Sequence, residues 1–151
     1  MKTLRIGSGA GYSGDRIEPA VELAEQGDLD YLVFECLAER TIALAQQARL
    51  ADPEAGYDPL LSERMRRVLP FVGRGIDGNR RRLRVITNMG AANPMAAARE
   101  VRRIAAELGL NSLKVAALTG DDVLDALQAD PSLLLDNGAS LGSLGERLIS
   151  A

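Results

Sequence analysis

Short apolar runs alternate with amphipathic segments along this chain. Four runs have the length of a strand, at residues 4–6, 31–34, 83–87 and 113–118. Between them, the spacing of apolar residues predicts helices over residues 18–27, 38–50, 59–70 and 94–109, and a short helix that ends near residue 128. This alternation is typical of βα units. We therefore predict a three-layer α/β fold with a mostly parallel, Rossmann-like sheet. Half of a larger α/β barrel is the alternative, because βα units build both folds.

Local signals refine several of these boundaries. Asn93 is predicted to cap the helix that follows it, with Pro94 as the first helical residue. Pro70 is predicted to end or kink the helix that begins after Asp58. Residues 73–82 are basic and contain glycine, which predicts an exposed connection.

The last part of the chain has a different composition. Residues 130–151 carry leucines among scattered glycine, serine and asparagine and end without a capping signal, where a fifth strand could start. We therefore predict an α/β domain with a strand-end binding site over residues 1–129. Residues 130–151 are predicted to form a tail that leads toward a continuation outside this chain.

The absence of histidine restricts the chemistry that these 151 residues can perform. The sequence holds neither a Ser-His-Asp triad nor a histidine-ligated zinc site, so acid–base work falls to carboxylates, lysine, tyrosine or the single thiol, Cys36. A lone cysteine fits the reducing cytoplasm, and for such a thiol an inert buried site is the commoner outcome.

The partner classes are also restricted by composition. The chain has 18 basic and 21 acidic side chains, a net charge of −3, and only three tyrosines, two phenylalanines and no tryptophan. These values disfavour a nucleic-acid partner, which requires basic patches and stacking surfaces. No apolar run approaches the ~20 residues of a membrane span, so we expect no membrane partner.

Polar and small residues gather where the predicted strands end. In parallel α/β sheets, ligands bind beyond the carboxyl ends of the strands, where loops lead into helix N-termini. This rule selects residues 7–15, 35–36, 88–93 and 119–122. Asp121 and Asp122 could hold a cation with phosphates, but adjacent acids at a helix start more often cap the helix, and we predict no metal site.

One segment also satisfies the G-x-G-x-x-G pattern of dinucleotide-binding folds. Gly9, Gly11 and Gly14 supply the glycines, and Glu35 follows 21 residues after Gly14, where ribose hydroxyls would be bound. The pattern starts late after the strand, and the first helix signal, Pro19, comes later than the fingerprint requires. A plain glycine turn is an equally good interpretation.

Five blocks in the same order resemble the acyclic terpene utilisation (AtuA) family, with this chain as the N-terminal portion. The first block reads Arg-Ile-Gly-Ser-Gly-Ala-Gly-Tyr-Ser-Gly-Asp-Arg, and the fourth reads Thr-Asn-Met-Gly-Ala-Ala-Asn-Pro. The blocks lie at residues 5–16, 30–41, 56–59, 87–94 and 120–122. The resemblance implies a role in the catabolism of acyclic monoterpenoids such as citronellol and geraniol, on a carboxylate or CoA-thioester intermediate. The reaction and the cofactor stay unknown.

The resemblance and the strand-end rule together suggest roles for individual residues. Asp15 and Glu35 are candidate acid–base groups, and Asn88 would orient a carbonyl or oxyanion. The candidate cofactor- or ligand-binding residues are Gly9, Gly11, Gly14, Asn93, Gly120 and Asp121. The expected partners are a small molecule, with an acyl-CoA as one candidate, the rest of a longer chain, and a second copy as another candidate. Two other functions stay open: a dinucleotide-binding oxidoreductase domain, and a non-enzymatic scaffold for acyl-CoA enzymes.

Overall fold

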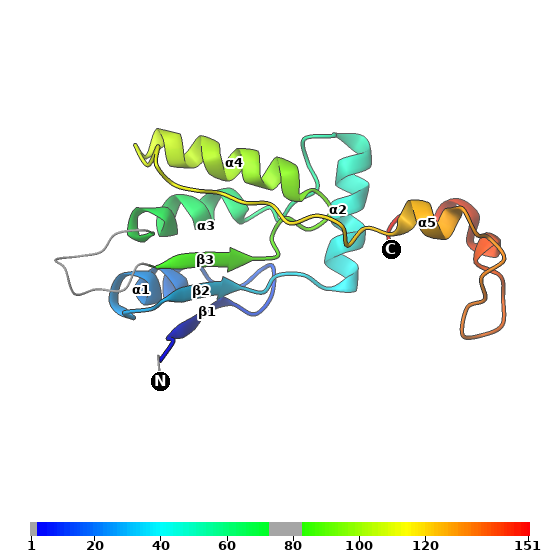
Figure 1. The fold of residues 1–151 in the computed structure, drawn as a ribbon, viewed down its shortest axis with the longest axis horizontal. Coiled ribbons are helices and arrows are strands. Elements are labelled where there is room, and N and C mark those ends of the chain that lie inside the picture. Colours follow the sequence, from blue (N-terminus) through cyan, green and yellow to red (C-terminus); the bar gives the residue numbers. More distant parts are fainter. Residues whose placement is uncertain (1–2, 73–82) are drawn as a thin grey trace.

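The computed structural model describes residues 3–72 and 83–151. The predicted basic connection at residues 73–82 therefore lies outside the described residues. Three parallel strands form one sheet in the order β1-β2-β3, with helices between them in the chain (Figure 1). The predicted α/β fold with a parallel sheet is thus confirmed.

The strands occupy three of the four predicted runs. They are β1 (Ile6–Ala10), β2 (Tyr31–Phe34) and β3 (Arg84–Thr87). β1 starts later than predicted and includes part of the glycine-rich stretch. At Gly9, a Cβ atom would lie 2.7 Å from Cε1 of Phe34, so the missing side chain lets the buried Phe34 ring lie against β1. The first glycine of the dinucleotide pattern therefore packs inside the sheet.

The helices agree closely with the predicted periods. They are α1 (Glu18–Gln26), α2 (Glu39–Ala51), α3 (Leu61–Val68), α4 (Pro94–Glu107) and α5 (Leu124–Gln128). Two 3-10 segments, η1 (Leu69–Phe71) and η2 (Leu141–Arg147), complete the list. η1 contains Pro70, which ends α3 as predicted.

One face of the sheet carries the core. Leu32 and Phe34 of β2 belong to a buried cluster with Ala20 of α1 and Met65 and Val68 of α3, and α4 packs on the other side of α3 (Figure 1). The opposite face holds exposed or half-buried side chains, with Ile6 64% and Ile86 53% exposed. Within the described residues, no helix covers this second face, although parallel sheets are normally covered on both.

The fourth predicted strand, at residues 113–118, does not form. The segment runs extended beside β3 (Figure 1), and half-buried Leu113, Val115 and Ala117 alternate with exposed residues, as in a strand. Among the described backbone hydrogen bonds, none joins it to β3. A cavity lined by both segments separates them. The periodicity therefore predicted the extended shape correctly, but strand pairing also requires contact with the edge of β3.

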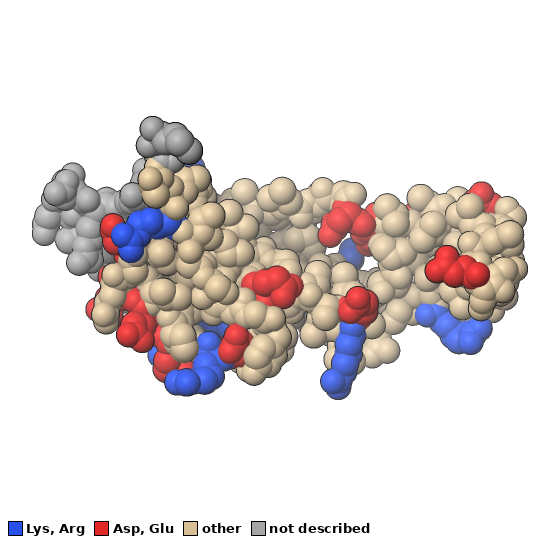
Figure 2. All heavy atoms as spheres, turned by 90° about the horizontal axis from the view of Figure 1, so that it is seen from below, with Lys and Arg blue, Asp and Glu red and all other residues tan. Residues whose placement is uncertain are grey.

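The C-terminal part projects away from the sheet. α5 and the residues after it lie beyond α2 (Figure 1), and the Val123 N–H donates to the Ala151 carbonyl at 3.1 Å, which closes this part on itself. The boundary at residue 129 stays a prediction. None of the helices within residues 3–72 and 83–151 has both the length and the apolar character needed to cross a membrane. Acidic and basic side chains are interspersed on the face shown in Figure 2.

Polar contacts tie α3 to α4. Ser62 Oγ donates to Glu100 at 2.7 Å, and Arg103 donates to the same carboxylate from Nε and Nη2, each at 2.7 Å. The Arg103 hydrogen bond is the largest cause of a lowered pKa at Glu100, about 2 against an ordinary value of 4.5. This carboxylate is only 15% exposed, and its hydrogen bond with Ser62 joins α4 directly to α3.

We predict that Glu100→Gln removes an acid-sensitive part of the stability. Since the folded pKa lies below the unfolded value, the carboxylate stabilises the fold fully above about pH 5, and this contribution is lost as the pH falls from about 4.5 to about 2. Urea unfolding of both proteins across this range should show a stability difference at pH 7 that shrinks steadily toward pH 2. A difference that is independent of pH would contradict the prediction.

Candidate functional site

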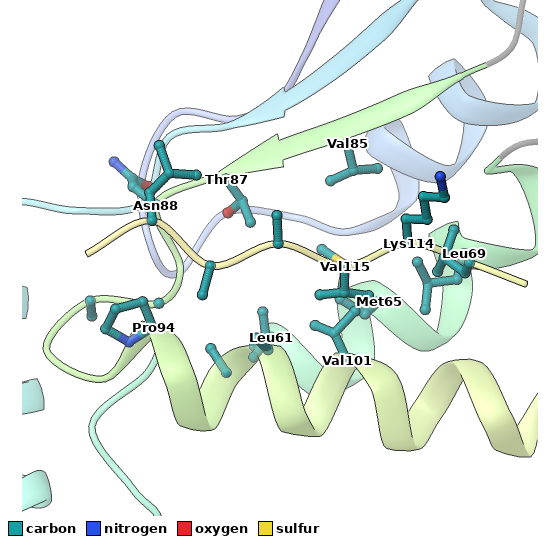
Figure 3. A pocket seen from close by; sticks show the side chains of 18 of the residues that line it. Leu61, Met65, Leu69, Val85, Thr87, Asn88, Pro94, Val101, Lys114 and Val115 are labelled. Atoms are coloured by element: carbon teal, nitrogen blue, oxygen red, sulfur yellow. The ribbon is translucent and has the colours of Figure 1, made fainter. Parts of the chain in front are cut away.

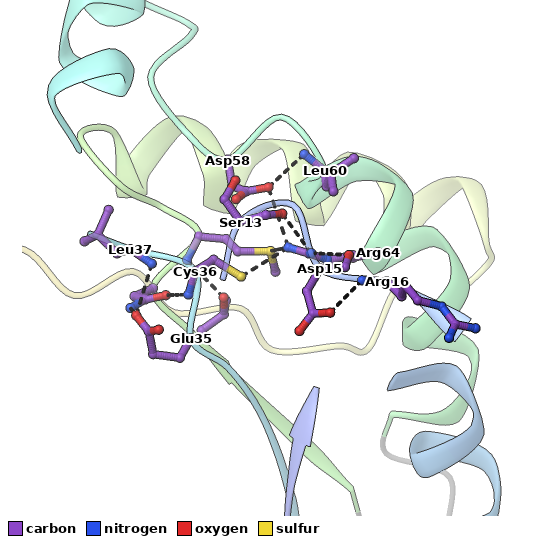
Figure 4. A network of polar contacts seen from close by, with 12 residues as sticks. Ser13, Asp15, Arg16, Glu35, Cys36, Leu37, Asp58, Leu60 and Arg64 are labelled. Atoms are coloured by element: carbon purple, nitrogen blue, oxygen red, sulfur yellow. Dashed lines mark hydrogen bonds and ion pairs between the residues drawn. The ribbon is translucent and has the colours of Figure 1, made fainter. Parts of the chain in front are cut away.

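A buried arginine joins the loops that follow the strands. Arg64 of α3 is 0% exposed, and its Nη2 donates to the carbonyls of Ser13 at 2.9 Å and Asp15 at 2.8 Å (Figure 4). Its Nη1 donates to Cys36 Sγ at 3.1 Å and lies 3.7 Å from the carboxylate of Asp58. The loops after β1 and β2 are therefore fixed to α3 by one guanidinium group.

The loop after β3 also contacts Arg64 and Asp58. Arg64 Nη1 also lies 3.6 Å from Met89 Sδ, and the Asp58 N–H donates to the Met89 carbonyl at 2.8 Å. Sequence reasoning missed Arg64. The available signal was its place in the stripe of Leu61, Met65 and Val68, because a charged residue within a buried helical stripe needs internal partners.

The glycine loop after β1 is bound to its own carboxylate. The N–H groups of Gly11 and Arg16 donate to Asp15 at 3.0 and 2.8 Å, and these two bonds are the main cause of the lowered pKa of Asp15. A helix start or glycine turn binds anions through free N–H groups. Here the Asp15 carboxylate already accepts the Gly11 N–H, which would otherwise be free to donate to a phosphate. Gly14 packs beside the ring of Tyr12 in the same loop.

The loop geometry also differs from that of a dinucleotide fingerprint. In the fingerprint, the glycines lie between the strand and the first helical turn, whose N–H groups bind pyrophosphate. Gly9 lies inside β1, and α1 begins only at Glu18, which places an acidic side chain in its first turn. The described loop therefore lacks the helix start that the pattern requires.

Glu35 and Asn88 form a pair across two strand ends. Asn88 Nδ2 donates to Glu35 Oε1 at 3.0 Å, and the Leu37 N–H donates to the same oxygen at 3.1 Å. These bonds, that of Asn88 first, lower the pKa of Glu35 and hold it as a carboxylate. Asn88 Oδ1 in turn accepts the Cys36 N–H at 2.7 Å. Both side chains are exposed, and one Nδ2 hydrogen of Asn88 has no described partner.

Asn93 has all its polar side-chain atoms engaged inside the fold. Its Oδ1 accepts the Ala96 N–H at 3.2 Å, which is the predicted cap of α4. Its Nδ2 donates to the carbonyls of Pro53 at 2.8 Å and Ala55 at 2.7 Å, and the residue is 8% exposed. The structure therefore places Asn93 as a structural link between α4 and the loop after α2, outside the cavity that Asn88 lines.

The last predicted segment contributes one residue to a cavity shared with Asn88. This cavity lies between β3, α3, α4 and residues 113–118 (Figure 3) and has a volume of about 330 Å³. Asn88 and Asp121 both line it. Gly120 has φ +112°, which favours glycine, and no atom lies near enough to contact a Cβ there. Asp122 accepts the Leu124 N–H at 3.1 Å, as expected of an acid at the start of a helix.

The predicted site is thus partly assembled. Glu35, Asn88 and Asp121 lie at or beside the cavity, whereas Asp15 and the glycine loop lie on the other side of Arg64. Within the described part of the chain, no hydrogen bond or ion pair links Asp15 to Glu35.

Cys36 has the environment of an inert thiol. It is 4% exposed, and burial raises its pKa from 9.0 to about 11. The nucleophilic form of cysteine is the thiolate. At neutral pH, Cys36 therefore serves as a packing group and a hydrogen-bond acceptor of Arg64.

We predict that Arg64→Met destabilises the protein by about 3–5 kcal/mol, because it leaves the Asp58 carboxylate buried without its cation. Adding Asp58→Asn should recover part of this loss, since the uncompensated charge then disappears. Urea unfolding at pH 7 measures both effects.

Arg66→Met is the matched control on the same helix. Arg66 pairs with Glu107 at 2.9 Å but is 46% exposed, so its loss should cost less than about 1 kcal/mol. Equal losses for the Arg64 and Arg66 variants would disprove the role given to Arg64.

Comparison with known proteins supplies the family. The model of the acyclic terpene utilisation family protein AtuA matches residues 4–151. No curated protein and no solved structure gives a significant match. Because the match covers nearly all of the sequence, the chain belongs to the acyclic terpene utilisation family.

Proposed function

We propose that the protein is an enzyme, or the ligand-binding part of one, in the catabolism of acyclic monoterpenoids of the citronellol and geraniol type. Its ligand is a carboxylate or CoA-thioester intermediate. Family membership supports the pathway. The observation that carries the site is the Glu35–Asn88 pair, joined at 3.0 Å across two strand ends beside an apolar cavity.

The contacts of this pair suggest a division of roles. Glu35 is held as a carboxylate by the N–H groups of Asn88 and Leu37, so at neutral pH it can accept a proton but has none to donate. Asn88 is oriented by Glu35 and by the Cys36 N–H, and its remaining amide hydrogen can bind a carbonyl oxygen. A base beside a carbonyl-binding donor suits proton abstraction next to a thioester or carboxylate carbon.

The glycine loop has a supporting role in this proposal. Asp15 is a second carboxylate and is half-buried, but both of its oxygens already accept N–H groups, those of Gly11 and Arg16. We therefore place the base at Glu35 and keep Asp15 as an organiser of the loop. The oxidoreductase alternative loses support, because α1 begins at Glu18 instead of at the glycines.

We predict that Glu35→Gln abolishes function while preserving the fold. The glutamine oxygen can still accept the Asn88 and Leu37 hydrogens, but the side chain no longer accepts a proton, and general bases contribute about 10²–10⁴-fold in rate. The measurement is growth on citronellol of a host that depends on this gene, with the full-length protein.

Glu39→Gln, an exposed acid at the start of α2, is the matched control and should support normal growth. Circular dichroism and thermal unfolding of both variants check the fold. Normal growth with a stable Glu35→Gln protein would reject the proposed base. A calorimetric titration with NAD(P) and flavins tests the alternative, which requires saturable binding of one of them.

A further inference from the structure

An unassigned cavity next to β3 lies beside the Glu35–Asn88 pair. Its walls are mostly apolar: Leu61 and Met65 come from α3, Val85 from β3 and Val101 from α4, with Val115 opposite (Figure 3). Its volume of about 330 Å³ lies at the low end of the range for small-molecule sites, about 300–1,000 Å³. Such a space suits one short apolar chain better than a whole dinucleotide.

The wall of the cavity formed by residues 113–118 is not held to β3 by any described backbone hydrogen bond. All of residues 113–118 line the cavity, with Leu113, Val115 and Ala117 half-buried and the residues between them exposed. Within the described residues, no backbone hydrogen bond connects this segment to β3. Moving this segment away from β3 therefore breaks no described backbone hydrogen bond between the two, which gives an apolar ligand a way in.

The polar lining residues of the cavity differ between its two ends. Asn88 lies at the end opposite to Lys114 (Figure 3), and it carries the amide hydrogen that has no described partner. The groups around Asn88 are acidic, because Glu35 is bonded to it and Asp121 lines the same cavity. A ligand carboxylate at this end would meet like charges, whereas a neutral carbonyl would accept the Asn88 hydrogen.

We propose that this cavity binds the hydrocarbon chain of an acyclic terpenoid whose head is a neutral carbonyl, an ester or thioester, placed at Asn88. The inference rests on the proposed function for the terpenoid class, and it narrows the ligand from a carboxylate or thioester to the thioester. The cavity thus determines chain binding, and the charge around Asn88 determines which head group is accepted.

Methionine-methyl NMR of the full chain can locate the ligand. Met65 lines the cavity, whereas Met95 of α4 is 53% exposed and does not line it. With methyl geranate as the probe, we expect a saturable shift of the Met65 methyl signal and an unchanged Met95 signal. With geranate, the free acid of the same chain, we expect affinity weaker by about tenfold or more at pH 7.5.

Two alanine variants on one helix test the position. Ala98 lines the cavity, so Ala98→Leu should fill it and weaken methyl geranate binding by about tenfold or more. Ala106→Leu makes the same change at an exposed position outside this cavity and should bind as the wild type does. The methyl spectrum of each variant reports whether its fold is retained.

Three results would overturn the inference: an unmoved Met65 signal at saturating ester, binding by Ala98→Leu equal to that of Ala106→Leu, or geranate binding as tight as that of the ester. The proposed function is tested by a different experiment, the growth of the Glu35→Gln strain, so the two can fail independently. That variant should still bind methyl geranate, since Glu35 does not line the cavity.

Discussion

The buried guanidinium of Arg64 is the contact on which the arrangement of the strand ends depends. A cation that is withdrawn from water must be surrounded by acceptors, and this one takes them from the loop after β1, from Cys36 after β2 and from Asp58 before α3. Only its Nε atom lacks a described partner. Because the acceptors come from three separate loops, satisfying Arg64 fixes those loops relative to α3 and to one another. The positions of Glu35 and Asn88 follow from this constraint.

Polar residues at the strand ends fall into two groups. Some have all their side-chain hydrogen-bonding groups bonded within the fold, and others keep a group that can bind a ligand. Asn93 uses its amide to cap α4 and to bind two loop carbonyls. Asp15 accepts the Gly11 N–H of its own glycine loop. Asn88 also makes structural bonds, but it is exposed and keeps one donor. This distinction separates a side chain that positions the site from one that can reach a ligand. The sequence presents all three residues alike, as small polar groups in loops.

The open edge of β3 links the fold to the proposed ligand site. A fourth strand paired at this edge would bring residues 113–118 into hydrogen-bonding distance of β3 and leave no room for the cavity. The unpaired segment therefore creates the space and also forms its wall. Leu113, Val115 and Ala117 thereby line an apolar space at the edge of β3 in place of strand pairing. The shape of the site is thus a consequence of where the sheet ends.

The sequence by itself determined the parallel α/β class, three of the strands, the helices with their Pro and Asn signals, and the family, because each of these depends on periodicity or on neighbouring residues. The tertiary structure decided the role of Arg64, the pairing of Glu35 with Asn88 and the failure of residues 113–118 to join the sheet. These features join residues that are 28 positions apart for Arg64 and Cys36 and 53 for Glu35 and Asn88. Such contacts depend on how helices and strands pack, and a local pattern of hydrophobic and polar residues carries no information on which distant partner completes a buried charge.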